Sequence, residues 1–524
     1  MRTLAGPLIG FIAVVLGVSA AHVGSPDAWY EGPAGPYHVL VHIEAPGVIP
    51  GVAIVNVRVT GGGVERVTAV GNKFDATGGA PPPEIAKPVD ERPGWYRTTL
   101  WIMTSGSNSI TVGVSGAAGT GSVVVPLVAV PTRRLEFDRR LGLGLGTLGV
   151  VLFAGMLTIV GAAVREGVLP PGVEPDRRRR RLAWVARSAA ALVIALLLFG
   201  GWRWWGADDA AFVRSMFRPM ASAASVVEGT EGRSLVMAIR DSSWIMRNDP
   251  TWLRTHGAPR RTPLIADHGK LMHLFLIGES GAVFAHLHPA TADSVRFTSP
   301  LPPLPAGVYR VFGDIVHESG LAQTLVSSVE IPPVSSSKGL IVWKGDPDDA
   351  WAVRDTVGSG NSAMLEDGSR MTWLRSDSPL IAGSDASLRF VVTAPEGAPA
   401  SLEPYMGMPA HAVVVRDDGK VFIHLHPRGT ISTAAQMSFE MREPGDSIAG
   451  RLAQRLAMDT ADGARGHSRM DTGMSSGRTA GAPSDTVSFP YAFPEAGAYH
   501  VWVQVKRQGR VATGVFIARV DPPR

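Results

Sequence analysis

The chain has no cysteine among its 524 residues, so disulfide bonds, thiolate metal sites and thiol catalysis are excluded. Any metal site must be built from histidine, methionine or carboxylate side chains. Charged residues make up only 18% and aromatic residues 7%, whereas there are 60 glycines and 40 prolines. This balance favours short strands joined by many turns over helical bundles. The length exceeds that of one ordinary domain and predicts several folded units.

The excess of positive charge is small, at +4, and does not indicate nucleic-acid binding. Five consecutive arginines, Arg177 to Arg181, stand between two apolar stretches and lack interleaved aromatic residues. The stretches predict transmembrane helices over residues 141–164 and 183–205, because each is long enough to span a bilayer. We therefore predict that residues 165–182 form an arginine-rich cytoplasmic loop.

The first 20 residues are typical of a secretory signal peptide, since Arg2 precedes an apolar stretch over residues 8–18 and small residues follow it. An uncleaved anchor is the alternative. In both cases the chain from residue 21 onward is expected outside. This predicts a protein of the bacterial inner (cytoplasmic) membrane, with its domains facing the periplasm or the cell exterior.

Outside the predicted spans, strand-like runs alternate with glycine and proline turns. The pattern predicts a mainly β protein with three immunoglobulin-like or cupredoxin-like β-sandwich domains, over residues 22–132, 214–333 and 339–524. Residues 430–485 are rich in Gly, Ser, Ala and Asp, and we expect a disordered insertion there. Gly-x-Tyr steps at Tyr309 and Tyr499 predict tyrosine corners, which are typical of Greek-key sandwiches.

The second and third domains repeat one histidine pattern. His273 and the segment His-Leu-His-Pro from His286 match His411 and the same segment from His424, without a gap and at a constant offset of 138 residues. Alternate residues of a strand share a face, so the two histidines of each His-x-His pair point the same way. A two-residue hairpin turn would pair His273 directly with His286, and His411 with His424.

These patterns predict metal binding in both repeats. The third domain adds two methionines just before its first histidine, and thioether together with imidazole ligands suits copper, especially Cu(I), better than zinc or calcium. A purely structural role for the same side chains is the alternative. Met458, His467, Met470 and Met474 in the insertion are weaker candidates. The predicted ligands are His268, His273, His286, His288, Met406, Met408, His411, His424 and His426.

The segment from Met406 to His411, Met-Gly-Met-Pro-Ala-His, and the Gly-x-Tyr step resemble the YtkA-like and FixH-like families of periplasmic immunoglobulin-like domains. That resemblance implies an association with copper handling. The whole arrangement also resembles a family of two-span bacterial membrane proteins with paired His-Leu-His-Pro domains, which implies no activity. A His-x-His pair followed by the Gly-x-x-His step ending at His500 is similar to cupin metal motifs, but only one repeat has that step.

Together the patterns predict a non-enzymatic, membrane-anchored periplasmic metal-binding protein for copper storage, delivery or sensing. Its expected partners are periplasmic or membrane copper proteins, and not nucleic acids. The alternative is a scaffold or interaction module of a membrane complex whose histidines are structural. A cupin-like metalloenzyme is the less favoured third hypothesis.

Overall fold

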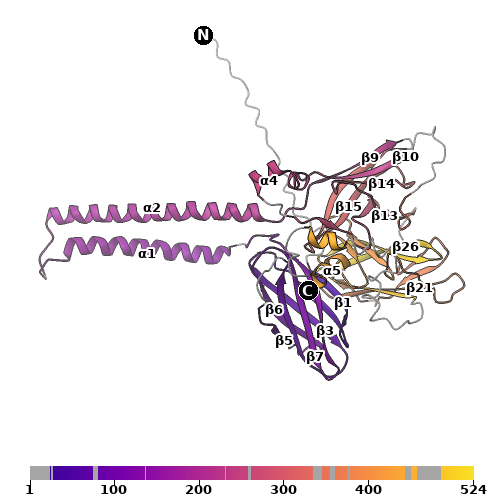
Figure 1. The fold of residues 1–524 in the computed structure, drawn as a ribbon. Coiled ribbons are helices and arrows are strands. Elements are labelled where there is room, and N and C mark those ends of the chain that lie inside the picture. The colour runs from indigo at the N-terminus through magenta and orange to yellow at the C-terminus, as the bar shows by residue number, and fades with distance from the viewer. Residues whose placement is uncertain are drawn as a thin grey trace, which may run out of the picture. The chain divides into compact units, whose positions relative to one another are not determined.

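The computed structural model divides the chain into two compact units, a helical unit, Val130–Arg218, and a β unit formed by Met1–Ala129 together with Pro219–Arg524. The mainly β class with two long apolar helices is confirmed (Figure 1). The structure describes residues 24, 27–74, 81–135, 137–170, 172–229, 232–257, 261–333, 345–354, 360–375, 378–442, 450–456 and 485–523. The predicted signal peptide lies outside these residues.

The helical unit consists of α1 (Arg139–Glu166) and α2 (Arg177–Ser215). Each helix begins after an aspartate, because the carboxylates of Asp138 and Asp176 accept hydrogen bonds from backbone N–H groups of the first turn. Both helices are long and apolar enough to cross a membrane, with a mean hydropathy of 2.2 over 18 residues of which 6% are buried. Helices of a soluble core would be covered, whereas these are not.

The connection between the helices is shorter than predicted. We expected a loop over residues 165–182, but α1 continues to Glu166 and α2 already begins at Arg177. All five arginines of the block therefore belong to the first turns of α2. The Asp176 cap explains this start, because it satisfies the backbone N–H of Arg179, at 2.7 Å, before the apolar part of the helix begins.

The first β-domain is an eight-stranded sandwich with the pairing order β1-β2-β3-β6-β5-β4-β7-β8. Its strand β3 shows why it folds this way, since Ala53, Val55, Val57 and Val59 are buried at every second position. The strands are β1 (Ala28–Ala34), β2 (Tyr37–Glu44), β3 (Gly51–Thr60), β4 (Val64–Lys73), β5 (Glu84–Pro88), β6 (Trp95–Ile102), β7 (Gly106–Gly116) and β8 (Gly119–Ala129).

The second β-domain has a three-stranded sheet, β14-β10-β9, and a larger sheet in the order β11-β15-β12-β13-β17, with β16 also on β15. Its elements are β9 (Ser222–Gly229), β10 (Gly232–Ile239), α3 (Ser242–Ile245), α4 (Pro250–His256), β11 (Leu264–Ile265), β12 (His273–Gly278), β13 (Val283–Leu287), β14 (Arg296–Pro300), β15 (Gly307–His317), β16 (Ala322–Ile331) and β17 (Ala350–Val353). The predicted boundary at residue 333 is wrong, because β17 follows the linker and still pairs with β13.

The third β-domain pairs β18-β19-β21-β24 in one sheet and β20-β26-β25-β22-β23 in the other. Its elements are β18 (Ser362–Met364), β19 (Arg370–Trp373), β20 (Leu380–Ile381), β21 (Ala386–Thr393), β22 (His411–Arg416), β23 (Phe422–Leu425), α5 (Thr433–Glu440), β24 (Thr486–Tyr491), β25 (Gly497–Arg507) and β26 (Arg510–Asp521). Helix α5 corrects the expectation of disorder from residue 430, since Ala434, Ala435 and Ser438 are buried. The four candidate ligands of the insertion lie outside the described residues.

Both predicted tyrosine corners are present. The hydroxyl of Tyr309 donates to the carbonyl of Pro305, at 2.8 Å, and that of Tyr499 donates to the carbonyl of Glu495, at 2.7 Å. A buried hydroxyl that returns to the backbone a few residues upstream is the mark of this motif. This bond fixes the start of β15 and β25. These two strands pair with β12 and β22, the first strands of the two histidine hairpins.

The two histidine hairpins have identical registers, but the predicted register is wrong. Phe275 pairs with His286 and Val413 with His424, so this register leaves four residues instead of two between Gly278 and Val283, and between Arg416 and Val421. The shift is two residues, which keeps every side chain on its face. His273 therefore still shares a face with His286, although the two residues are diagonal rather than opposite.

The two repeats pack face to face through aromatic pairs that are reciprocal. Phe284 stacks on Trp502 with ring centroids 5.2 Å apart, and its counterpart Phe422 stacks on Phe312 at 4.3 Å. Phe312 and Trp502 are themselves counterparts, at an offset of 190 residues. Reciprocal contacts of this kind define an interface with an approximate twofold axis. One buried cluster of nine side chains from both domains forms its apolar half.

Candidate metal centre

The other half of this interface is made of histidines. All seven histidines predicted as ligands lie together there. Ring centroids of His273 and His424, from different domains, are 5.3 Å apart, and those of His268 and His411 are 5.5 Å apart. The expectation of a separate site on each hairpin is therefore replaced by one cluster that both domains build.

Three histidines of the second domain form the first group. Ligand atoms of His273, His286 and His288 all lie within 4.8 Å of one another, and all three residues are buried. His273 comes from β12, while His286 and the adjoining His288 come from β13 and its end. The Nδ1 atom of His273 is 3.1 Å from Nε2 of His286. We call these three residues group A.

A second group combines the two domains. Ligand atoms of His268, His411 and His426 also lie within 4.8 Å of one another. His411 begins β22 and His426 follows β23, but His268 belongs to a turn of the second domain. We call these three residues group B. The seventh histidine, His424, contacts both groups, with its ring centroid 5.3 Å from that of His273 and 4.6 Å from that of His426.

Oxygen acceptors fix the proton position on three of the rings. His273 Nε2 lies 3.2 Å from the carbonyl oxygen of Asp267, and His426 Nδ1 lies 3.2 Å from that of Ile431. His288 Nδ1 lies 3.0 Å from a carboxylate oxygen of Asp349. A carbonyl or carboxylate oxygen accepts, so each of these nitrogens must donate its hydrogen. The opposite nitrogen of each ring then carries a lone pair, which in His288 and His426 has no partner among the described residues and in His273 faces Nε2 of His286.

Several of the remaining nitrogens have no partner in the described part of the chain. They are Nε2 of His288, His424 and His426 and both ring nitrogens of His411. A buried polar atom without a partner costs about 1–3 kcal/mol, and native proteins seldom keep several together. Converging lone pairs without hydrogen-bond partners are the arrangement that a metal ion would satisfy. The residues present thus fit a metal ion.

Burial lowers the pKa of five of the seven rings and so favours their neutral form, namely His273, His286, His411, His424 and His426. Burial, and secondarily the neighbouring His288 and His286, lower the pKa of His273 well below its usual value. Burial and His426 do the same for His411, and burial brings the pKa of His426 to about 4. Imidazole binds metals in its neutral form, so the site is prepared for an ion at neutral pH.

Carboxylates lie behind the histidines. Asp349 bonds to His288, Asp267 Oδ1 is 3.8 Å from His268 Nε2, and Asp314 Oδ2 is 3.5 Å from His424 Nδ1. Burial raises the pKa of Asp314 to about 7. Carboxylates in this position orient ligating histidines and increase their basicity.

The two predicted methionine ligands lie in the turn that corresponds to the His268 turn. Met406 and His268 both have a positive φ, 49° and 51°, and each turn is closed by an isolated bridge, Tyr405 with Met408 and Asp267 with Lys270. Met406 therefore occupies the position of His268 across the approximate twofold axis. Met408 is buried beside it.

Histidines outside the cluster have other partners. His317 Nδ1 lies 2.7 Å from the carbonyl of Thr262, and its ring contacts Trp244. His500, on which the cupin likeness depends, bonds to Asp417 at 2.9 Å and stacks on Trp502. The step that resembles a cupin motif thus belongs to the interface and not to the histidine groups.

The first β-domain holds the end of the His426 segment. Glu31 donates its backbone N–H to the carbonyl of Arg428, at 2.7 Å, and Tyr30 forms a bridge with Gly429. Ile431, whose carbonyl accepts from His426, packs in the core of the first domain. The first and third domains therefore together position the His426 ring.

Sequence reasoning missed the polar residues around the rings. Gln504 Oε1 lies 2.8 Å from His286 Nδ1, and the Tyr405 hydroxyl, 3.4 Å from the same atom, donates to the carbonyl of Asp348. Asp314 and Gln504 hold the same place in the repeat, opposite His273 and His411 in the ladders. Their types differ, so the repeat did not identify them. A partial signal existed, because both lie five residues after a corner tyrosine.

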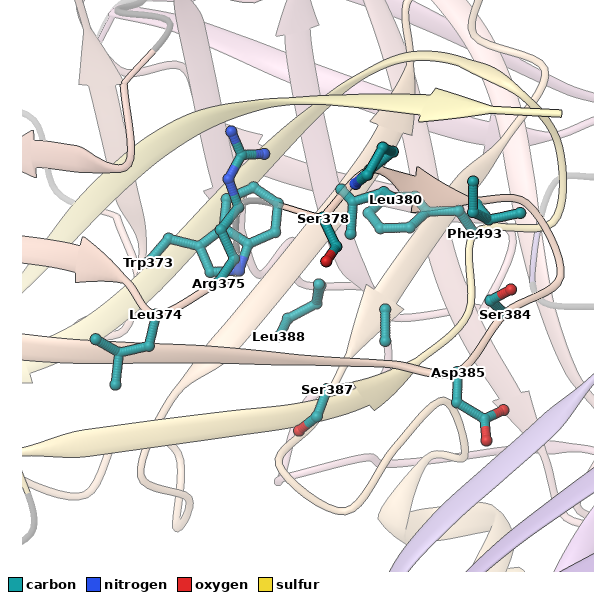
Figure 2. Close-up of a pocket in the computed structure, with 13 residues that line it drawn as sticks. Trp373, Leu374, Arg375, Ser378, Leu380, Ser384, Asp385, Ser387, Leu388 and Phe493 are labelled. Carbon is teal, nitrogen blue, oxygen red and sulfur yellow. The ribbon is translucent and has the colours of Figure 1, made fainter. Parts of the chain in front are cut away.

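One cavity of about 270 Å³ lies in the third domain, lined among others by Trp373, Ser378 and Phe493. Figure 2 shows the Arg375 side chain over the Trp373 ring, and the guanidinium carbon is 5.1 Å from the ring centroid. Asp385, on the rim, pairs with Arg92 of the first domain. None of the seven clustered histidines lines this cavity.

Comparison with known families and structures adds no activity. A family model described as a domain of unknown function (DUF8832) matches residues 363–449, which cover part of the third domain. No curated protein matches the chain.

Among solved structures, an engineered protein is 23% identical over 18% of this chain and 21% of its own, with a TM-score of 0.15. The alpha-2-macroglobulin of E. coli is 9% identical over 96% of this chain and 23% of its own, with a TM-score of 0.18. The chain thus spans less than a quarter of either protein. A putative membrane anchored protein from Corynebacterium diphtheriae is 9% identical over 95% of this chain and 96% of its own, with a TM-score of 0.13. TM-scores this low carry no argument about fold or function.

Proposed function

We propose that this chain is a membrane-anchored copper-binding protein whose metal site lies between its second and third β-domains, on the outer side of a bacterial inner membrane. The observation that carries the proposal is the convergence of buried imidazole nitrogens, in His288, His411, His424 and His426, that lack hydrogen-bond partners among the residues the structure describes. Its role is copper storage, delivery or sensing, in exchange with periplasmic or membrane copper proteins.

The donor set supports copper. Calcium and magnesium require oxygen ligands, whereas neutral imidazoles suit copper and zinc. The thioether of Met406, placed by the twofold relation where the other half has His268, favours Cu(I) over zinc. A binding role is preferred to catalysis because the site is enclosed, with His424 the most exposed of the strand histidines at 8%.

The test uses the full chain in detergent, stripped of metal and titrated under anaerobic conditions with Cu(I) against a competing chelator, and separately with Zn(II). We expect tight Cu(I) binding that falls at least 100-fold in the variant His424→Ala with His426→Ala. Two exposed histidines provide the matched control, His38→Ala with His256→Ala, which should bind like the natural protein.

The rival scaffold role predicts a different result. If the cluster variant and the control variant lose copper to the chelator at the same concentration as the natural protein, the clustered histidines are structural and the copper proposal is wrong. Tighter binding of Zn(II) than of Cu(I) would show that copper is the wrong metal, while the proposed position of the metal site would stand.

A further inference from the structure

The two histidine groups are close enough to act as one centre. Group A and group B are joined by ring contacts between the domains, with centroids of His273 and His268 6.3 Å apart and those of His286 and His411 also 6.3 Å apart. His424 lies between them, and its Nε2 atom has no partner in the described chain. A single ion cannot satisfy lone pairs distributed over both groups.

The charges around the groups point the same way. Asp267, Asp314 and Asp349 each pair with a histidine of the cluster, and among the described residues none of the three forms an ion pair with lysine or arginine. Carboxylates that are ionised here place negative charge in a poorly solvated region, which is costly unless cations accompany it. Two bound ions would supply those cations.

The approximate twofold axis also defines the two ligand sets. Group B takes His411 and His426 from the third domain and His268 from a turn of the second. The symmetric set is His273 and His288 with Met406, from the equivalent turn of the third domain. His286 and His424 are counterparts and take equivalent places. Each set therefore contains three histidines or more and one ligand from the other domain.

We propose that the cluster is a two-ion centre, in which one copper ion binds group A together with Met406 and a second binds group B together with His424. This inference rests on the proposed copper-binding function and adds the number, spacing and ligands of the ions. The ion of group A has a thioether ligand and the ion of group B has nitrogen ligands only, so their preferences for Cu(I) and Cu(II) differ.

The experiment counts ions in the full-length protein in detergent. Metal-free protein is loaded with excess Cu(II), freed of unbound metal and assayed for copper per chain. We expect two ions in the natural protein and in the control His38→Ala with His256→Ala. We expect one ion in His273→Gln with His288→Gln, and one in His411→Gln with His426→Gln. Glutamine preserves polarity, and each variant is checked for folding by thermal denaturation and gel filtration.

Electron paramagnetic resonance tests the spacing. Two nearby Cu(II) ions couple their spins, so the natural protein should give a weakened or broadened signal for its copper content, whereas each one-ion variant should give the full signal of an isolated ion. For Met406, Cu(I) X-ray absorption should show a sulfur neighbour that Met406→Leu removes.

The outcomes are distinguishable. One ion per natural chain, lost in both double variants, would overturn the two-ion proposal and leave copper binding intact. Two ions without spin coupling would overturn the spacing, and therefore the proposal. No bound copper in the natural protein would overturn the proposed function itself, and so would two ions retained in both double variants.

Discussion

Asp314 and Gln504 occupy the same position in the two repeats, and each faces a histidine of the opposite domain. Asp314 Oδ2 is 3.5 Å from His424 Nδ1, and Gln504 Oε1 is 2.8 Å from His286 Nδ1. The geometry is repeated but the charge is not. The half of the cluster around His424 has a carboxylate where the other half has an amide, so it should bind a cation more tightly.

Replacing Asp314→Asn should stabilise the metal-free protein at high pH and weaken its binding of copper. Burial raises the pKa of Asp314 to about 7, so the folded state binds more protons than the unfolded state between pH 4 and 7, and stability falls as pH rises through that window. Without metal, the variant should therefore be more stable than the natural protein above pH 7, by roughly 4 kcal/mol at most. With copper it should bind about 10- to 100-fold more weakly.

Urea denaturation at pH 5 and pH 8, with and without copper, measures both effects. Asn keeps the shape of the side chain and an oxygen that can accept the hydrogen bond from the Thr324 hydroxyl. An equal loss of stability at both pH values without metal would show that the Asp314 carboxyl is not the source of the effect.

His317 should make the metal-free protein sensitive to acid. Burial lowers its pKa to about 4, so between pH 6.5 and 4 the unfolded state binds the proton more readily, and stability falls as pH decreases through that range. In His317→Gln this contribution, roughly 3 kcal/mol at most, should be absent. Denaturation curves at pH 7, 5.5 and 4.5 give the slope, and an unchanged slope would contradict the prediction. Copper stoichiometry should not change, because His317 lies outside both groups.

Trp502 should tolerate phenylalanine but not alanine. Its counterpart is Phe312, so Trp502→Phe gives both sides of the interface the same aromatic pair, and it removes an indole N–H that lacks a partner among the described residues. We expect Trp502→Phe to cost less than about 1.5 kcal/mol and Trp502→Ala to cost about 3–5 kcal/mol. Urea denaturation measures both costs. Equal losses of stability for the two substitutions would show that an aromatic ring at position 502 is not what stabilises the interface.

Gly281 should be harder to replace than Gly509. Both have a positive φ, 69° and 72°, which costs an alanine about 1–2 kcal/mol. A Cβ atom on Gly281 would also lie 2.5 Å from Nε2 of His500, across the domain interface, whereas one on Gly509 meets nothing within 4 Å. Thermal denaturation of the two glycine-to-alanine variants should show a larger loss for Gly281→Ala. Equal losses of stability would mean that the His500 side chain moves aside to accept the added Cβ atom.

The proposed topology predicts that Glu174, between the helices, and Asp209, near the end of α2, lie on opposite sides of the membrane. Reporter domains active on only one side, fused at these positions, should give opposite signals. The same signal at both would exclude two spans in this orientation.

The sequence singled out the seven histidines of the cluster but did not predict that the two repeats bring them together. A constant offset between His273 and His411 identifies equivalent strands, and an alternating pattern places His286 with His288 on one face. Neither feature says that the two faces meet, because that depends on Phe284, Trp502 and other side chains whose partners are hundreds of residues away. The hairpin register was missed for a local reason, since a four-residue loop and a two-residue loop produce the same alternation.

The reciprocal contacts between the repeats have an evolutionary consequence. An interface in which residue i touches j and the counterpart of i touches the counterpart of j is the interface of a symmetric homodimer. Its presence within one chain follows most simply from duplication and fusion of a gene whose product paired with itself. While the copies were identical, every substitution altered both halves at once. Once the copies are encoded separately that constraint is gone, and the counterpart pairs Asp314 and Gln504, or His268 and Met406, are differences that a homodimer of identical chains cannot have.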